Sequence, residues 1–473
     1  MIIDRLLDLE KAPAARSYGA NEYNLDRYRA LLESLANPQQ GLGFLHVAGT
    51  KGKGSTCAMA EAMLSGLGHP TAFYSSPHLE HFGERFRLDG IPLTAAEFEA
   101  ALQSFFDLLP PEVRATFEGP HSYRTVFETL TALALIEFRK GRDAARAAGR
   151  KPQVICWETG LGGRLDCTNV VDPLVTAITT LGMDHCRLLG DRIEQIAAEK
   201  AGIVKPGRPV IVGRQKPEYH DAVWPVLVSR AAEMGAPVVR AWEHNPVLAS
   251  RPVPEGQVVR MRFPDGAEAE GLLPLRGGFQ LGNLEVAVAS CWYALRALGL
   301  PAPSGEALLA GLTGTSWPAR FEVVERTGRP ALVLDGAHCP LSAEALGREA
   351  GRWLAARGED RAVLLWAMQR DKDHAAFLRA LRAGLGNGTR IDRAVTYPVV
   401  SVRGAAPEEL AAVARKAGLE AEAAADAQSA LRLAESAGLP VIAAGSLYTP
   451  AVLRRAAVTP REEQPGANAL PRL

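Results

Sequence analysis

The segment of residues 44–55, FLHVAGTKGKGS, joins an apolar run to a loop rich in glycine, lysine and hydroxyl groups. The next residues, 55–67, have the composition of a helix. A buried strand, a glycine-rich turn and a helix N-terminus together direct backbone N–H groups toward a phosphate. The spacing departs from the standard P-loop, because Gly54 separates Lys53 from Ser55. We predict a nucleotide-phosphate loop here, against the alternative of a turn that binds no ligand. Its residues are Gly49, Gly52, Lys53, Gly54 and Ser55.

Other groups capable of chemistry stand at the ends of later apolar segments. The strand predicted in VICWETGLGG (154–163) ends in Glu158, and the strand predicted in LVTAITTLGMDH (174–185) ends in His185. Ligands bind outside the carboxyl ends of parallel strands. A carboxylate in that place, after a phosphate loop, resembles the metal-side acid of a nucleotide site. The alternative for Glu158 is a satisfied polar residue at a strand end.

Two further features accompany these strands. Lys200 follows Ile196 and Ala197 by one helical turn, so its spacing favours the protein interior, although a helical lysine is more often a surface cation. The segment of residues 71–90 begins as a strand and runs into a long irregular stretch that contains SSPHL, which carries Ser76. Long loops beside a phosphate site are often functional. A solvated surface loop is the equally open alternative.

The order of elements predicts how these residues are positioned. Strand–helix–strand units repeat up to residue 213 and indicate a mainly parallel sheet. Alternating apolar positions within 215–275 indicate a small antiparallel excursion. The α/β rhythm restarts after 314–320. We therefore predict an α/β protein with a P-loop ATPase-like N-terminal domain and a smaller Rossmann-like C-terminal domain. The predicted limits are 1–316 for the domain that carries the phosphate loop, 317–458 for the C-terminal domain and 459–473 for a disordered tail.

Composition excludes several classes of function. Lys plus Arg equals Asp plus Glu at 53 each, so no global charge favours nucleic acid or an anionic membrane. Six scattered cysteines without a CxxC pair indicate reduced thiols rather than a disulfide framework or zinc ribbon. No signal peptide and no run of about 20 apolar residues is evident. We expect a cytoplasmic protein, and a monomer because no heptad pattern stands out.

With these pieces placed, the sequence resembles the folylpolyglutamate synthase/dihydrofolate synthase family of the Mur ligase superfamily. The resemblance extends from residue 44 to residue 448 and follows one order of motifs. These are AGTKGKGS, YSSPHL, ETGLGGRLDCTN, LGMDH, AAEKAGIVK, QLGN, WPARFE, DGAH and AAGSLY. It implies a ligase that uses ATP to join L-glutamate to dihydropteroate, to reduced folates or to both, through an acyl phosphate. Another Mur-type amino-acid ligase is the nearest alternative; those enzymes carry an additional N-terminal domain, whereas some 43 residues precede this phosphate loop. A nucleotide-dependent switch is a more distant one.

The resemblance also implies roles for particular residues. Ser76 and Glu158 would hold one Mg²⁺, and His185 would help to hold a second, with Glu158 shared or nearby. Lys200 matches the lysine that CO₂ carbamylates in this family, which converts a cation into an anionic oxygen ligand for the metal. Together with Lys53, these groups form the implied catalytic set. The implied nucleotide contacts outside the phosphate loop are Asn283, Arg320, Asp335 and His338.

The acceptor pocket of bifunctional family members matches two segments of this chain. The resemblance implies that Phe127 packs against the pterin and that Asp166 accepts its amine hydrogens, although Phe127 is equally well an ordinary core residue. The implied pocket comprises Thr125, Val126, Phe127, Glu128, Leu165, Asp166 and Cys167. The chain departs from the family at three places. These are Lys51 where Asn is usual, Cys186-Arg187 where Thr and Asp are common, and Cys339 where Asn is usual.

Overall fold

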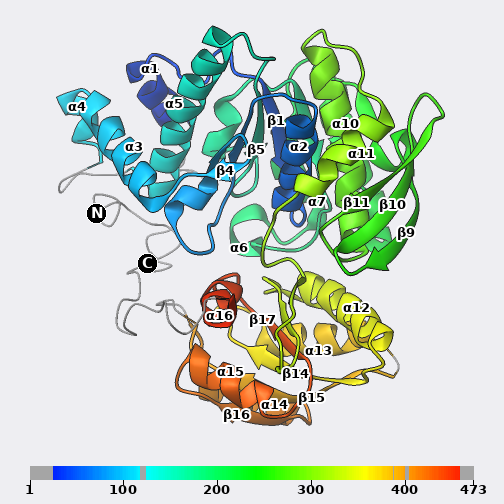
Figure 1. The fold of residues 1–473 in the computed structure, drawn as a ribbon. Helices are drawn as coiled ribbons and strands as arrows, with labels where there is room; N and C mark the ends of the chain where they lie inside the picture. Colours follow the sequence, from blue (N-terminus) through cyan, green and yellow to red (C-terminus); the bar gives the residue numbers. More distant parts are fainter. Residues whose placement is uncertain (1–24, 118–123, 387, 400–403, 459–473) are drawn as a thin grey trace. The chain divides into compact units, whose positions relative to one another are not determined.

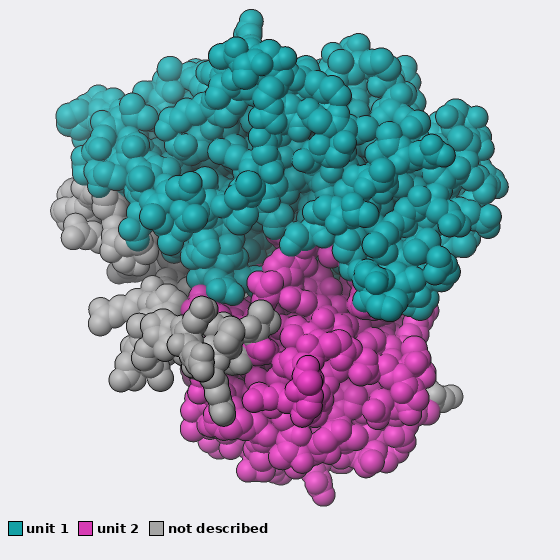
Figure 2. Space-filling model, viewed as in Figure 1, with its two compact units in different colours: residues 1–274, 280–316 teal, residues 275–279, 317–473 magenta. Residues whose placement is uncertain are grey.

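The computed structural model describes residues 25–117, 124–386, 388–399 and 404–458, and these pack into two units. The first comprises residues up to 274 together with 280–316, and the second comprises 275–279 and the residues from 317 onward (Figure 2). The predictions for the first 24 residues and for the tail at 459–473 lie outside the described residues. Among the described residues, no helix is long and apolar enough to cross a membrane.

The first unit is built on an eight-stranded sheet whose central strand is β1 (Figure 1). In spatial order the strands are β4 (Ile91–Pro92), β3 (Phe86–Leu88), β2 (Thr71–Tyr74), β5 (Val154–Glu158), β1 (Phe44–Ala48), β6 (Val175–Ile178), β7 (Val210–Val212) and β8 (Val238–Arg240). The run from β2 to β8 is parallel, whereas β3 and β4 pair antiparallel. The mainly parallel sheet is therefore confirmed. The segment predicted to be irregular after β2 contains these two additional short strands.

Helices cover both faces of this sheet, because alternate residues of a strand point to opposite sides. Ile155 and Trp157 of β5 join a core cluster with residues of α1, α3 and α5. On the same face, residues of β6 and β7 pack with α7 and α8. Cys156 of β5 points to the opposite face, where it lies near Cys57 of α2 and Cys291 of α10. The long helices of the unit are α1 (Leu25–Ser34), α2 (Lys53–Gly66), α3 (Ala95–Leu108), α5 (Val126–Ala147), α7 (Ile193–Ala201), α8 (Pro217–Glu233) and α10 (Phe279–Ala297). The shorter ones are α4 (Pro111–Arg114), α6 (Cys186–Leu189), α9 (Ala241–His244), α11 (Gly305–Gly311), η3 (Phe82–Arg85), η4 (Cys167–Val170) and η5 (Leu312–Gly314).

Two helix starts in this unit follow the same local rule. Thr94 and Thr125 each precede a helix, and the Glu three residues later bonds back to the threonine N–H in both cases. This reciprocal capping box satisfies backbone donors that have no partner inside the helix. The box at Thr94 is exposed, whereas that at Thr125 is buried. The buried box therefore fixes where α5 begins.

The antiparallel excursion predicted within 215–275 is also present. Its strands are β9 (Val247–Val253), β10 (Gly256–Arg262) and β11 (Glu268–Leu273), and they form a separate antiparallel sheet beside α11 (Figure 1). The strand predicted at 174–185, in contrast, ends at Ile178. The residues after it form a loop because Thr180 accepts the N–H groups of Thr50 and Lys51 at 3.0 and 3.2 Å.

The second unit is a smaller α/β sheet of six strands. In spatial order they are β12 (Glu322–Val324), β13 (Leu332–Leu334), β17 (Val441–Ala444), β14 (Arg361–Trp366), β15 (Arg390–Thr396) and β16 (Glu420–Ala423). Only β12, among these strands, runs antiparallel to its neighbour. Its helices are α12 (Pro340–Ala356), α13 (His374–Leu385), α14 (Pro407–Lys416), α15 (Ala427–Glu435) and α16 (Tyr448–Val458). The first three contribute to one core cluster and the last two to another, on opposite faces.

Candidate functional site

The phosphate loop follows β1 and turns directly into α2, as the sequence predicts. Gly52 is the N-cap of α2 and has φ 94°, in the left-handed region. A Cβ atom there would lie 2.1 Å from Oδ1 of Asn283, so only glycine fits both the conformation and the space. Gly49 has φ 156°, and a Cβ atom built there would likewise collide with the Thr179 side chain. This turn places the first N–H groups of α2 at the end of the loop, where an anion is favoured.

Two buried residues of α10 pack against the phosphate loop and the start of α2. Asn283 donates to Gln280 at 2.9 Å, and Gln280 donates to the Ser55 hydroxyl at 3.4 Å. Gln280 is completely buried, and Asn283 and Ser55 are nearly so. The structure thus brings Asn283 to the phosphate loop. Sequence reasoning assigned no role to Gln280, although it opens the QLGN motif.

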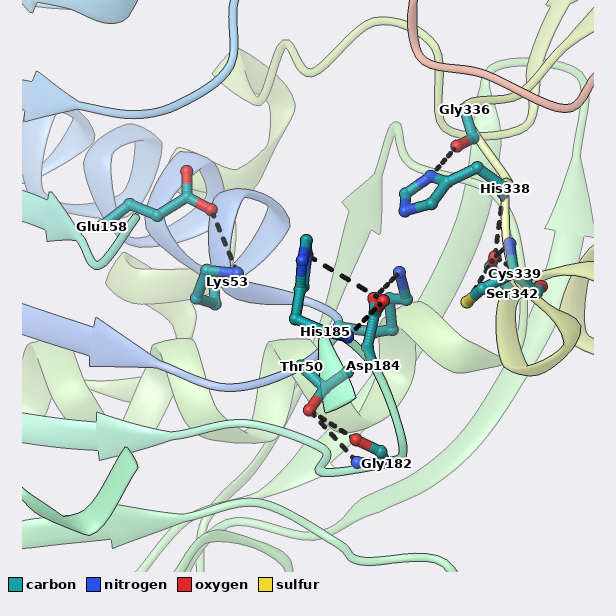
Figure 3. A network of polar contacts seen from close by, with 11 residues as sticks. Thr50, Lys53, Glu158, Gly182, Asp184, His185, Gly336, His338, Cys339 and Ser342 are labelled. Atoms are coloured by element: carbon teal, nitrogen blue, oxygen red, sulfur yellow. Dashed lines mark hydrogen bonds and ion pairs between the residues drawn. The ribbon is translucent and has the colours of Figure 1, made fainter. Parts of the chain in front are cut away.

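Lys53 and Glu158 meet at the carboxyl ends of β1 and β5. Val47 of β1 lies opposite Glu158 in the sheet, and the Lys53 ammonium is 3.8 Å from Glu158 Oε1 (Figure 3). Glu158 is only 5% exposed. Ser76 lies two residues beyond β2, and Tyr74 of that strand pairs with Trp157, so Ser76 and Glu158 occupy the same edge of the sheet. A nearly buried carboxylate that attracts a cation is thereby placed beside the phosphate loop.

The loop after β6 ends in His185 and is tied to the phosphate loop. Thr50 and Gly182 exchange two hydrogen bonds, of 3.1 and 3.2 Å (Figure 3). Lys51 pairs with Asp184 at 3.0 Å, across 133 positions of sequence. His185 has φ 52° and precedes α6, and its side chain is about half exposed. Lys51, whose role sequence reasoning did not derive, is therefore one half of an ion pair.

Lys200 points into the protein, as its spacing from Ile196 and Ala197 predicts, and is 4% exposed. Burial, followed by repulsion from the Lys53 ammonium, lowers the pKa of Lys200 from 10.5 to about 7. Asp184 and Asp166 act in the opposite direction. The amine of Lys200 is consequently neutral in a large fraction of molecules near neutral pH, which an ordinary lysine is not.

The residues predicted to bind the acceptor are near one another, but most of their polar atoms already have partners. Glu128 accepts the Thr125 N–H at 2.9 Å and pairs with Arg124 at 3.4 Å. Asp166 accepts hydrogen bonds from the N–H groups of Leu161 and Thr168 and from the Thr168 hydroxyl. Thr125, Glu128 and Asp166 thus serve the local fold. Their contact with an acceptor stays a prediction.

The remaining members of this group supply apolar surface. Phe127 is half buried, lies 6.1 Å from the Tyr74 ring, and leaves no room for a Cβ atom at Gly160. Val126 and Cys167 are buried in the core cluster, and Leu165 is half buried. Phe127 is the aromatic residue of the predicted acceptor pocket, and its ring packs against Gly160 in the turn after β5. A flat ligand could stack on such a ring.

His46 is a buried polar residue that sequence reasoning missed, although it interrupts the apolar run of β1. Its Nε2 lies 3.0 Å from the Thr159 hydroxyl and 3.2 Å from the Thr168 hydroxyl. Because Thr168 donates its proton to Asp166, it can only accept from His46, so Nε2 carries the proton. Burial lowers the pKa of His46 to about 3 and keeps the ring neutral. This neutral ring links β1 to the turn that follows Glu158.

The predicted nucleotide residues of the second unit form a network of their own. Asp335 accepts the N–H groups of Phe321 and Ala337, both at 2.8 Å, and Arg320 donates to Ala319. These bonds fasten the turn before β12 to the turn after β13. His338 contacts the Gly336 carbonyl at 2.8 Å (Figure 3).

Cys339, one of the departures from the family, is the N-cap of α12. A thiol is a weak cap, and here the Ser342 hydroxyl accepts the N–H groups of both His338 and Cys339, at 3.1 and 3.2 Å. Ser342 therefore makes the N3 half of a capping box, which is not the bond that an N-cap Asn would make to an N–H group inside the helix.

The six cysteines are all free. Five are buried, and Cys186, directly after His185, is exposed. Burial, as the largest cause, raises the pKa values of Cys57 and Cys156 well above the ordinary range. Among the described residues, no three His, Cys, Asp or Glu side chains gather into a metal cage.

Known proteins resemble this chain over most of its length. No protein-family model matches the sequence. The dihydrofolate synthase/folylpolyglutamate synthase of Bacillus subtilis is 31% identical over 357 residues, which cover 76% of this chain and 78% of that protein. The Mycobacterium tuberculosis folylpolyglutamate synthase complexed with ADP and AMPPCP superimposes with a TM-score of 0.78 and 28% identity, over 93% and 96% of the two chains. A solved FPGS–AMPPCP–folate complex superimposes with a TM-score of 0.74 and 26% sequence identity. The superposition covers 97% of this chain and 98% of that chain.

Proposed function

The chain belongs to the folylpolyglutamate synthase/dihydrofolate synthase family, and from this premise we propose that it joins L-glutamate to both dihydropteroate and reduced folates. It is an ATP-dependent, amide-forming ligase of folate metabolism. The observation that carries the assignment is the glycine-rich loop between β1 and α2, with Lys53 3.8 Å from Glu158. The double acceptor range is supported by the name of the Bacillus subtilis relative.

The reaction proceeds in two steps in this proposal. An acceptor carboxylate oxygen attacks the γ-phosphorus of ATP, so that ADP leaves and an acyl phosphate forms. The glutamate amine then attacks the acyl carbon, loses a proton and expels inorganic phosphate. Both steps require the protein mainly to position the reactants and to stabilise phosphoryl charge. The phosphate loop supplies N–H donors, and Lys53 supplies a cation for the transferred phosphoryl group.

The residues near Lys53 suit Mg²⁺. Glu158 and Ser76 offer oxygen ligands at one sheet edge, and His185 offers an imidazole that is about half exposed. When bound, Mg²⁺ neutralises charge on the phosphoryl oxygens. Two such ions are proposed, with Glu158 shared or nearby. Glu158 is nearly buried and already has one cation beside it, the Lys53 ammonium at 3.8 Å.

A carbamate on Lys200 is part of the same proposal. CO₂ reacts with the neutral amine, and the lowered pKa of Lys200 makes that form abundant near pH 7. The product carries a negative charge instead of a positive one. It would relieve the repulsion from Lys53 and offer the metal an oxygen ligand.

The other assignments complete the picture. Asn283 supports the phosphate loop, while Arg320, Asp335 and His338 of the second unit contact the nucleotide. The acceptor ring rests on Phe127, among the segments 125–128 and 165–167. We further propose that the protein is a cytoplasmic monomer, that its domains divide at 316/317 and that it needs no nucleic acid or membrane partner.

The decisive measurement is ATP-dependent phosphate release by the purified protein with glutamate and Mg²⁺, comparing dihydropteroate with tetrahydrofolate as acceptor. Release with both acceptors is expected. Release with tetrahydrofolate alone would restrict the proposal to chain extension and withdraw the pterin role of the 125–128 segment. Release with neither acceptor would leave only a Mur-type ligase of another carboxylate. Omission of glutamate is the matched control for simple ATP hydrolysis.

A further inference from the structure

Lys51 stands in the phosphate loop but differs in its contacts from Lys53. Its ammonium lies 3.0 Å from Asp184 Oδ2, and the two side chains are 26% and 10% exposed. A pair with this little solvent around it is screened less than a surface pair. It is also short enough to be a charge-assisted hydrogen bond. The Lys51 charge is therefore directed at a carboxylate on another loop.

Asp184 passes this contact on to His185. While Oδ2 meets Lys51, Oδ1 accepts the His185 N–H at 3.0 Å. His185 holds a left-handed backbone, with φ 52° and ψ 35°. A non-glycine residue rarely adopts this conformation, and it persists only where its surroundings enforce it. The bond to Asp184 is one such constraint, and Lys51 orients the carboxylate that makes it.

Several neutral hydrogen bonds also join the two loops in the part of the chain that the structure describes. These involve Thr50 with Gly182, the N–H groups of Thr50 and Lys51 with the Thr180 carbonyl, and the Thr179 hydroxyl with the Lys51 carbonyl. They hold the backbones together near residues 179–182. Among these contacts, the Lys51–Asp184 pair is the one that reaches as far as His185.

We propose that Lys51 is a positioning residue for His185: by fixing Asp184, it holds His185 in the orientation in which its imidazole serves the phosphoryl-transfer site. This inference rests on the proposed function and deepens it. Groups that orient a metal-binding residue typically contribute about 10-fold to 100-fold in metal affinity or activity. The rival role for Lys51 is a direct contact with nucleotide phosphate, which its place between Thr50 and Gly52 also allows.

Four variants separate these roles. Lys51→Met keeps the aliphatic stem and removes the charge, Lys51→Arg keeps the charge, and Asp184→Asn removes the partner. The double variant K51M/D184N completes a double-mutant cycle, which measures the coupling between Lys51 and Asp184. Lys216→Ala is the matched control, because Lys216 is a similarly exposed lysine (22%) that pairs with Glu218 at 3.4 Å.

The first readout is kinetic. Lys51→Met should raise the Mg²⁺ concentration for half-maximal rate and lower kcat, each by about tenfold, and leave the KM for ATP within about threefold. Asp184→Asn should reproduce this pattern, the double variant should be no worse than the poorer single one, and Lys51→Arg should restore most of the rate. A tenfold rise in the KM for ATP with Lys51→Met but not with Asp184→Asn would overturn the proposal in favour of a phosphate contact.

The second readout needs no catalysis. Amide hydrogen exchange of the ligand-free protein should speed up over residues 179–192 in Lys51→Met and Asp184→Asn, and stay at the wild-type rate in Lys216→Ala. Unchanged exchange in both loop variants would also refute the positioning role. Because this arm is independent of substrate, it fails or succeeds separately from the ligase assignment, which the wild-type phosphate-release assay tests.

Discussion

The phosphate-loop region and the region proposed to bind the acceptor, residues 125–128 and 165–167, use their polar residues in opposite ways. Around the phosphate loop, burial is the largest cause of the lowered pKa of Lys200, and repulsion from Lys53 and Lys51 lowers it further. The Lys53–Glu158 pair is 3.8 Å long, beyond hydrogen-bond distance. In the proposed acceptor region, the carboxylates of Glu128 and Asp166 accept hydrogen bonds from backbone N–H groups of their own segments, at 2.9 and 3.0 Å.

This contrast teaches where function and stability are located. Cations that repel one another are stabilised when an anion binds between them. The phosphate-loop region therefore favours binding of an anionic ligand. Capped and fully bonded groups gain little from a ligand and lose much when a partner is removed. Substitutions around the phosphate loop should therefore reduce the rate, and those in the acceptor region should reduce the free energy of unfolding.

The largest effect is expected for Lys53→Ala. It removes the cation that we propose to lie next to the transferred phosphoryl group, at the first residue of α2, so turnover should fall by about 1,000-fold while the fold persists. Steady-state phosphate release and circular dichroism measure the two quantities. Lys151→Ala, at an exposed lysine bonded to the Leu67 carbonyl, is the control. Turnover within tenfold of wild type would end the phosphate-loop assignment.

Lys200→Ala should lower kcat by about 100-fold because the proposed carbamate ligand is lost. Short carboxylic acids can occupy the vacated space and return an oxygen anion, so they should recover part of the rate. The assay compares kcat with and without added acetate or propionate. A fully active variant in the absence of acid would refute the carbamate.

The pKa of Lys200 also predicts a dependence of stability on pH. The folded-state value of about 7 lies below the ordinary 10.5, so the unfolded chain binds more protons between these two pH values. The free energy of unfolding therefore rises with pH across that window. Below pH 7, Lys200 is protonated in both states, so the free-energy cost of burying its charge is constant. In CO₂-depleted buffer, Lys200→Met should be more stable than wild type at pH 7, on the order of 1–3 kcal/mol, with the gain shrinking toward pH 10.5. Denaturant unfolding at pH 7 and 10 tests the sign; an equal gain at both would contradict it.

The smallest effect, and the one that sharpens the contrast, belongs to Thr125→Ala. Loss of the buried capping box should cost about 1 kcal/mol of unfolding free energy and change kcat by less than about threefold. Thr94→Ala removes the exposed equivalent and should cost less, because water can replace its bonds. A large loss of rate with unchanged stability would move Thr125 from the scaffold to the site.

Much of the fold was predictable because it depends on local pattern. The parallel units, the antiparallel excursion and the inward direction of Lys200 all follow from periodicity and chain order. The start of α5 also has a local sequence signal, because TVFE is a capping box. The Lys51–Asp184 pair was not predictable, because the residues are 133 positions apart and neither lies in a periodic segment. His46 left a weak signal, a single polar residue in a buried strand.

The unequal burial of the six thiols offers a practical handle. Five are enclosed in the protein, and the exposed one, Cys186, adjoins His185. A maleimide dye added to the native protein should therefore couple at a single defined position without engineered cysteines. The attached fluorophore would sit next to the loop that Lys51 is proposed to hold, so its emission would report loop rearrangement during nucleotide binding in real time.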